Sequence, residues 1–294
     1  MTRSPKVPAW RVDFALAAVV CIWSLNFVLL KAVLPRFDPL ALAATRFVCV
    51  GVLFELLLRR RGAPEAMARE DRGAFVASAL LGYTLYQGAF ILALHHSTVF
   101  STALMINTGP VWAGVALWLT GAERVGARRW RGFLLALAGL LVYVGPQVLA
   151  GTTAGTGDLL ALGAAVSWAL YGIRNKRLLE RYSALYVTTR TFQIGALLFL
   201  PFAVPAVLRQ HWAGVGLGGW GAVAFSVVFP ITLAVTLWNW AIGQQGVGRT
   251  AVYQYLVPVV SGVLSWLVLA EGFGSRKLAG GVLILLGVAL SRGR

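Results

Sequence analysis

Charge is scarce in this sequence, and acidic charge is the scarcest. Only 12% of the 294 residues are charged, with 10 Asp and Glu against 26 Lys and Arg. A soluble domain carries about 25% charged residues, because it must cover a surface that faces water. The shortage therefore excludes a soluble globular protein.

Cysteines and clustered metal ligands are also missing. The two cysteines, Cys21 and Cys49, lie inside apolar runs and predict neither a disulfide nor a metal site. A membrane enzyme such as a lipid transferase would need clustered acids or metal ligands near the end of a span, and the sequence offers none. We therefore expect no enzymatic activity, no cofactor and no metal.

Long apolar runs are what the sequence does have. Hydrophobic residues make up 59% of it, and the mean hydropathy is +0.76. Runs of about 20 apolar residues recur along the chain, and each can cross a bilayer core of about 30 Å. The alternation of a membrane barrel is absent. We predict an all-α membrane protein with ten spans at roughly 12–34, 38–58, 73–94, 98–121, 132–149, 157–178, 183–207, 218–242, 247–270 and 278–292.

The net charge of +16 is explained by membrane topology rather than by nucleic acid. Most Lys and Arg residues lie in loops on the side of the N-terminus, and this excess places both termini in the cytoplasm. The opposite side holds Arg36, Arg209, Arg276 and Lys277. The first apolar run continues to about Leu34, too far for a signal peptide. We expect a multi-pass protein of the cytoplasmic (inner) membrane, surrounded by lipid and compatible with a monomer, with no nucleic-acid partner.

Two stretches, 107–141 and 255–289, match at a constant offset of 148 residues. The matched pairs are Pro110 with Pro258, Gly114 with Gly262, Trp118 with Trp266, Glu123 with Glu271, Gly126 with Gly274, Gly132 with Gly280 and Gly139 with Gly287. At an offset of 145, Asp13, Trp23 and Lys31 match Asp158, Trp168 and Lys176. This register indicates an internal duplication.

The duplication divides the chain into residues 1–149 and 150–294, with five predicted spans in each half. Because five is odd, the second half must begin on the opposite face of the membrane. The halves are then inverted repeats about an axis in the membrane plane. That architecture is typical of secondary transporters, whose substrate site lies near the midplane between the repeats.

Each half ends in a span, a Glu-x-x-Gly turn and a Gly-containing span, from Pro110 to Gly139 and from Pro258 to Gly287. With Trp23 and Trp168 in the first helix of each half, this pattern resembles the drug/metabolite transporter superfamily and its EamA-type repeats. The resemblance covers nearly the whole chain, although Ala122 and Ala270 precede the Glu where the family usually has Gly. Within the family, the chain looks most like bacterial exporters of the YddG type, which favour aromatic and other apolar amino acids.

A transporter of zwitterions needs a few polar groups in its cavity and a wall that suits the substrate side chain. Polar and aromatic residues in mid-span are therefore the candidates. Trp is unusual at mid-membrane, and a buried amide must face protein or water. The predicted substrate-binding residues are Trp23, Asn26, Tyr83, Gln87, Asn107, Trp168, Tyr171, Trp238, Asn239 and Gln254. Interhelical packing and hydrogen bonding is the alternative role for each of them.

Other residues in the spans have two interpretations each. Pro110, Pro230 and Pro258 are hinge candidates or passive bends. Arg46 and Arg190, at matching depth in the second helix of each half, could meet a carboxylate or reach an interface. None of the acids is expected at mid-membrane, and Asp13 and Asp158 suit helix N-caps. His95 and His96 are expected in an exposed loop, and Lys31 near an interface.

The sequence thus predicts an inner-membrane transporter that exports small amphipathic metabolites, above all aromatic and apolar amino acids, through alternating access of the two halves. One alternative is the same fold carrying phosphorylated or nucleotide-linked metabolites, which would need several cationic residues in the cavity. A proton-coupled drug exporter is the other, but small multidrug exporters of this superfamily need a Glu in the first helix. Trp23 and Asn26 occupy that region here, so a facilitator fits better.

Overall fold

The computed structural model describes residues 8–60, 62, 66–121, 126–245, 250, 252–272 and 274–292, and every regular element in these ranges is a helix. In chain order they are α1 (Ala9–Val33), η1 (Leu34–Arg36), α2 (Pro39–Arg60), η2 (Arg69–Asp71), α3 (Arg72–Ala79), η3 (Leu80–Leu85), α4 (Tyr86–His96), α5 (Val99–Ile106), α6 (Gly109–Leu119), α7 (Ala127–Leu149), α8 (Thr153–Leu179), α9 (Ala184–Arg209), η4 (Trp212–Gly214), α10 (Gly216–Ser226), η5 (Val227–Ala234), α11 (Val235–Gln245), η6 (Val252–Tyr255), α13 (Leu256–Leu269) and α14 (Ser275–Arg292).

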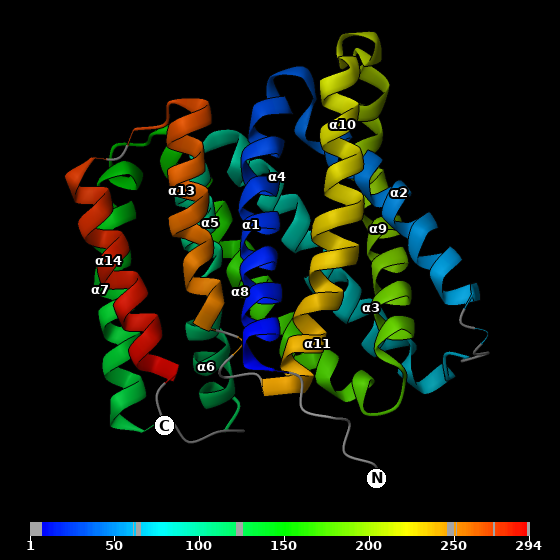
Figure 1. Ribbon diagram of the computed structural model, residues 1–294, viewed down its shortest axis with the longest axis horizontal. Coiled ribbons are helices and arrows are strands. Elements are labelled where there is room, and N and C mark those ends of the chain that lie inside the picture. Colours follow the sequence, from blue (N-terminus) through cyan, green and yellow to red (C-terminus); the bar gives the residue numbers. More distant parts are fainter. Residues whose placement is uncertain are drawn as a thin grey trace.

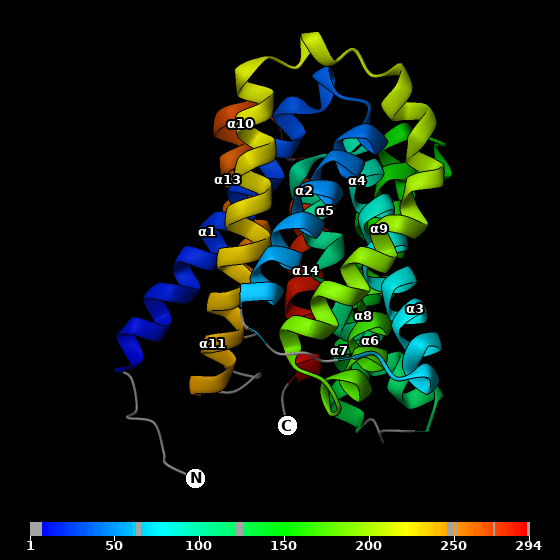
Figure 2. The same ribbon diagram turned by 90° about the vertical axis from the view of Figure 1, so that its right-hand side faces the viewer.

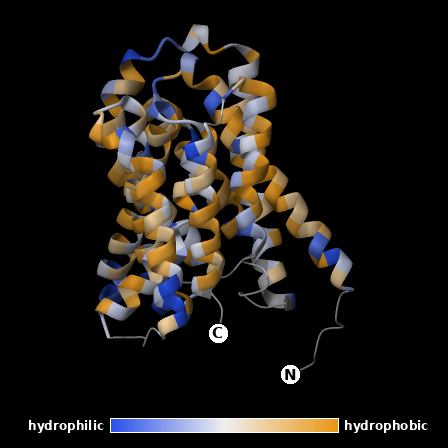
Figure 3. Ribbon diagram, turned by 90° about the vertical axis from the view of Figure 1, so that its left-hand side faces the viewer, coloured by the Kyte–Doolittle hydropathy of each residue, from blue (hydrophilic) through white to orange (hydrophobic). Residues whose placement is uncertain are grey.

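The helices are apolar on their outside as well as in the core. Large side chains such as Phe202, Leu208 and Leu267 are more than half exposed, and apolar residues dominate the shafts of the bundle (Figure 3). A helix that is hydrophobic all round belongs in a membrane or a large core. Among the described residues, eight helical runs are long and apolar enough to cross a bilayer. The chain is therefore a helical multi-pass membrane protein.

Two of the ten predicted spans lie outside this set of eight. The run Tyr253–Leu269 is apolar but shorter, and α14 has 18 residues with basic side chains at both ends. The count of ten therefore remains a prediction. The start of α1 and the end of α14 lie at the same end of the bundle, called the terminus end below (Figure 1). The Glu-x-x-Gly turn with Glu123 falls outside the described residues.

Several spans are interrupted, and the interruptions match between the halves. The π-helix η3 (Leu80–Leu85), shifted by 148 residues, falls within the π-helix η5 (Val227–Ala234). The break between α5 and α6, shifted likewise, falls at the junction of η6 and α13. Pro110 and Pro258 lie in the first turns of α6 and α13, where a missing N–H costs no helical hydrogen bond. Of the three hinge candidates, only Pro230, within η5, lies inside a helical segment.

The long helices pack in two groups around the middle of the bundle. α1 packs along α13 and along α10 and α11, while α8 packs along α4, α5 and α6. The α2–α9 pair and α3 complete the second group. α1 leans away from α3 and α9 toward the terminus end, as Figure 2 shows.

α7 and α14 form a separate pair at one side of the bundle (Figure 1). Their backbones touch at glycines: a Cβ at Gly132 would lie 2.7 Å from the carbonyl oxygen of Gly287, and one at Gly139 would lie 2.8 Å from that of Gly280. No side chain fits at such a distance. These four residues, which we call the glycine seam, fix the antiparallel register of the two helices.

Candidate substrate site

Trp23 lies in the middle of α1 and faces the interrupted helix of the second half. Its indole Nε1 donates to the carbonyl oxygen of Pro230 at 3.2 Å, and its ring lies 5.2 Å from that of Trp238 on α11. Tilted rings at this separation attract each other. Two of the predicted site residues and one hinge candidate are thus brought together, from α1, η5 and α11.

A second group of rings joins α4 to α8. Tyr86 lies 4.8 Å from Trp168, which lies 5.0 Å from Tyr171. Tyr86 also stacks on Phe90 at 6.2 Å, and Phe90 meets Phe27 of α1 edge-on at 5.4 Å. Trp168 keeps 42% of its surface exposed. We call Phe27, Tyr86, Phe90 and Trp168 the aromatic cluster; it reaches from α8 through α4 to α1.

Tyr83 and Tyr171 are placed differently from the other candidates. Their hydroxyls lie 3.2 Å apart, and Asn175 donates to Tyr171 at 3.1 Å. Each is only 7% exposed, and Tyr83 packs on Phe192 of α9. Tyr83 and Phe90, seven residues apart, face different neighbours, because the π-helical turn η3 changes the register: Tyr83 contacts α8 and α9, while Phe90 contacts α1. The pair serves an interhelical contact.

The remaining polar candidates are scattered. Asn26 is 8% exposed, and its Oδ1 has no hydrogen-bond partner. Asn107 ends α5 and donates to the carbonyl of Ala103 at 2.8 Å, within its own helix. Gln87 and Gln254 are partly buried, and the side chain of Asn239 lies outside the described part of the chain.

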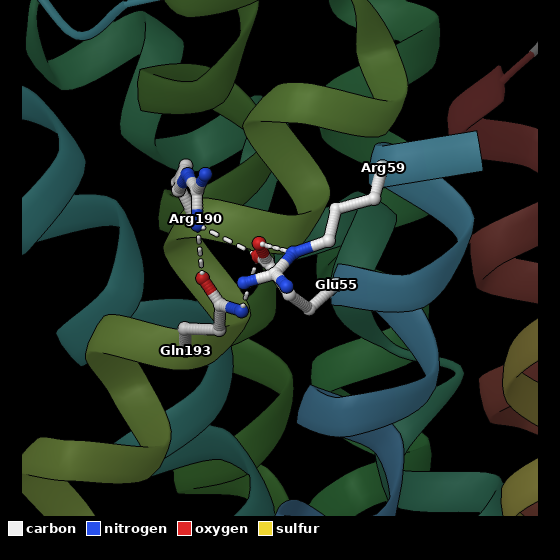
Figure 4. A network of polar contacts seen from close by, with 4 residues as sticks. All are labelled: Glu55, Arg59, Arg190 and Gln193. Carbon is white, nitrogen blue, oxygen red and sulfur yellow. Dashed lines mark hydrogen bonds and ion pairs between the residues drawn. The ribbon is translucent and has the colours of Figure 1, made fainter. Parts of the chain in front are cut away.

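The two arginines at matching depth have different surroundings. Arg190 of α9 donates to Glu55 at 2.9 Å and to Gln193 at 2.8 Å, and Gln193 and Arg59 also donate to Glu55 (Figure 4). Its charge is therefore compensated within the chain. Arg46 of α2 is only 3% exposed and donates from Nε to the Ser226 hydroxyl at 3.1 Å.

A polar junction closes the end of the bundle opposite the termini. Lys31 donates to the carbonyls of Leu94 (2.6 Å), His95 (3.2 Å) and Ser97 (2.6 Å), which end α4. Glu271 accepts from the backbone N–H of Val99, at the start of α5, at 2.9 Å. Exposed carbonyls suit a cation and exposed N–H groups suit an anion. α1, α4, α5 and the α13–α14 turn therefore meet here.

Asp158 belongs to the same junction, and its predicted role as an N-cap is wrong. α8 begins at Thr153, so Asp158 lies inside the helix, fully buried, and accepts from the hydroxyls of Ser97 and Ser101. Asp13 also lies within a helix and accepts from Tyr253 at 2.8 Å. Ser97 lies in the turn between α4 and α5 and Ser101 in the first turn of α5, so the spacing of these serines gave no signal of the contact.

The terminus end has its own contacts, between the α8–α9 turn and the segment before α3. Arg181 pairs with Glu70 at 2.6 Å and with Asp71 at 2.9 Å. Tyr182 donates to Asp71 at 2.6 Å, and this hydrogen bond to a carboxylate raises the pKa of the phenol. These contacts hold α3 against α8 and α9.

Similarity to known proteins decides the family of the chain. The model of the EamA-like transporter family matches residues 10–145 and again residues 155–293. The chain belongs to this family. The predicted resemblance to EamA-type transporters is thereby confirmed, and the two matches cover nearly all of the chain.

Curated relatives of the EamA-like chain are named as transporters. Uncharacterized transporter YvbV of Bacillus subtilis is 28% identical over 97% of this chain and 92% of its own. A probable amino-acid metabolite efflux pump of Escherichia coli is 27% identical over 96% and 95%, and one of Salmonella typhimurium is 26% identical over 95% and 93%. A solved crystal structure, 20% identical, matches 96% of both chains with a TM-score of 0.62, which supports the fold.

Proposed function

We propose that this EamA-like protein exports small amphipathic metabolites, above all aromatic and apolar amino acids, from the cytoplasm across the inner membrane. It acts as a facilitator, by alternating access of two inverted halves around a site between them. The observation that carries this proposal is the convergence of aromatic side chains from α1, α4, α8 and α11. These helices come from both halves of the chain, as a site between the halves requires.

The reciprocal contacts of the glycine seam support inversion of the halves. Gly132 corresponds to Gly280, and Gly139 corresponds to Gly287, at the 148-residue offset. Gly132 touches Gly287, and Gly139 touches Gly280. A two-fold axis has this signature: residue i contacts j, and the copy of j contacts the copy of i. Because α7 and α14 run antiparallel, the axis lies across the helices, in the plane of the membrane.

Ring chemistry and the relatives together favour amino acids as the substrate. The aromatic cluster and the Trp23–Trp238 pair offer apolar faces for a ring or an alkyl side chain. Two relatives of similar length carry the name of probable amino-acid metabolite efflux pumps. A wall of this kind suits a zwitterion with an apolar side chain better than a sugar phosphate.

The charges argue against phosphorylated or nucleotide-linked substrates. Such anions need several cationic side chains at once, and Arg190 is held by Glu55 and Gln193. Of the two arginines considered for this role, only Arg46 remains. Glu55 also fits a facilitator rather than a proton-coupled exporter, because two arginines and an amide already engage its carboxylate.

The test is uptake by proteoliposomes that hold the purified protein. Labelled Phe, Trp, Met and Thr should enter with saturable kinetics, which unlabelled substrate inside the vesicles accelerates by exchange. Trp168→Ala should lower the rate for Phe, whereas Trp266→Ala, at a 57% exposed position on α13, should leave it unchanged. The proposal fails if none of the four amino acids shows saturable uptake.

A further inference from the structure

Arg46 is a buried cation that forms no ion pair with a carboxylate of the described residues. The residue is 3% exposed, and among the ion pairs of the described residues none includes it. Nε donates to Ser226, whose own hydroxyl donates to the carbonyl of Val223 at 2.8 Å. Nη1 is buried and has no hydrogen-bond partner. The guanidinium is thus held at one nitrogen and unsatisfied at another.

The equivalent arginine of the second half shows how the chain compensates such a charge elsewhere. Arg190 has Glu55 as its counter-ion, 135 positions away in the sequence. An uncompensated charge is far more costly to bury than a paired one. An arginine inside a membrane span that lacks a counter-ion of its own therefore marks a place where an anion binds.

The surroundings of Arg46 identify the rest of that anion. Arg46 lies on α2, which packs against α4, the helix that carries Tyr86. Tyr86 stacks on Phe90 and lies against Trp168. A single positive charge therefore borders a wall of apolar rings. One carboxylate on an aromatic or apolar body matches both features.

We propose that Arg46 binds the carboxylate of the transported amino acid, with the substrate side chain against Tyr86, Phe90 and Trp168. This assignment rests on the proposed function and specifies its site. Ser226 holds Nε and so orients the guanidinium, leaving Nη1 to donate to the carboxylate in a charge-assisted hydrogen bond. Arg46 is buried here among α2, α4 and the end of α10, so the substrate reaches it when these helices separate during the transport cycle.

The sharpest test compares phenylalanine with phenethylamine, which keeps the ring and the amine but lacks the carboxylate. In wild-type proteoliposomes, unlabelled Phe should inhibit uptake of labelled Phe at least about tenfold more strongly than phenethylamine, because a hydrogen bond to a charged group is lost. In Arg46→Gln, the KM for Phe should rise and the two inhibitors should become equal. Arg46→Lys, which keeps the charge, should recover part of the preference.

Arg190→Gln is the control, since it removes the corresponding arginine of the second half, whose charge is compensated within the chain by Glu55. It should keep the preference for Phe over phenethylamine. If Arg46→Gln does not fold, the wild-type protein still decides, because equal protection by Phe and phenethylamine in a thermal-shift assay overturns the assignment. Retained preference in a folded Arg46→Gln overturns it too. Absence of amino-acid uptake by the wild type overturns both this inference and the proposed function.

Discussion

The indole of Trp23 donates a hydrogen bond to the carbonyl oxygen of Pro230 at 3.2 Å, across 207 positions of sequence. The acceptor lies inside a π-helical turn, and such turns occur frequently at functional sites. The bond ties the first helix of one half to the interrupted helix of the other. A contact of this kind would be made and broken as the halves move.

Trp23→Phe should therefore alter turnover more than stability. The ring can still pack on Trp238, but the donor is lost, at a cost of about 0.5–1.5 kcal/mol in one state of the cycle. We expect a change of about two- to tenfold in the rate of exchange of labelled Phe. Trp10→Phe, at a 64% exposed position in the first turn of α1, is the control. Equal rates for both variants would contradict a role of the bond in transport.

Tyr83→Phe should reduce stability and leave substrate affinity unchanged. The hydroxyls of Tyr83 and Tyr171 are buried against each other, so removal of one should cost about 1 kcal/mol of unfolding free energy. Tyr83→Phe with Tyr171→Phe should cost less than the sum, since both changes remove the same bond. Denaturant unfolding in detergent measures the stability. A raised KM for Phe in either single variant would instead place that tyrosine in the substrate site.

Lys31→Met should loosen the polar junction at the end opposite the termini. Three carbonyls that end α4 lose their cationic donor, so the α4–α5 turn should open more often. Hydrogen exchange of the backbone amides from Ser97 to Thr102 should become faster, and Glu271→Gln should act on the same amides more weakly. Arg209→Met removes an exposed cation from the last turn of α9 and should leave these amides unchanged. Unaltered hydrogen exchange in Lys31→Met would contradict the role of Lys31 in holding the α4–α5 turn closed.

Gly139→Ala should destabilise the protein, whereas Gly145→Ala on the same helix should not. A Cβ at Gly139 would meet the backbone of Ile284 at 2.7 Å, while one at Gly145 meets nothing within 4 Å. Overpacking of this kind typically costs about 1–3 kcal/mol, and alanine in an open helical position is favourable. Thermal unfolding of the two variants side by side gives the difference. If both variants unfold at similar temperatures, α7 and α14 can move apart at the glycine seam without loss of stability.

Much of the fold could be predicted from the apolar runs and the internal repeat. Eight predicted spans correspond to helices, seven of them to within five residues at each end, because about 20 apolar residues in a row cross a bilayer only as a helix. The interruptions were harder to predict. Pro110 and Pro258 signalled a disturbance, yet a proline is compatible with a kink and with a helix start, and only the packing of neighbouring helices selects the second.

Among the site residues, Trp23 and Trp168 could be selected because Trp is rare at mid-membrane. Arg46 and Arg190 could not be told apart, since the difference is a glutamate on another helix, Glu55, that reaches only one of them. Tyr86 left no distinct signal beside Tyr83. The π-helical turn Leu80–Leu85 decides which of the two tyrosines reaches Trp168. A sequence pattern with a period of 3.6 residues does not reveal the register of that turn.

The glycine seam limits how the molecule can move. Its two levels of contact are seven residues apart on α7, a distance of about 10 Å along the helix. Backbones that touch at both levels cannot slide past each other, because a small shift drives the next residue into the opposite chain. α7 and α14 thus form a fixed spine. If the halves alternate in access as proposed, their relative motion falls to helices that meet through long side chains, such as the rings of Trp23, Tyr86 and Trp168.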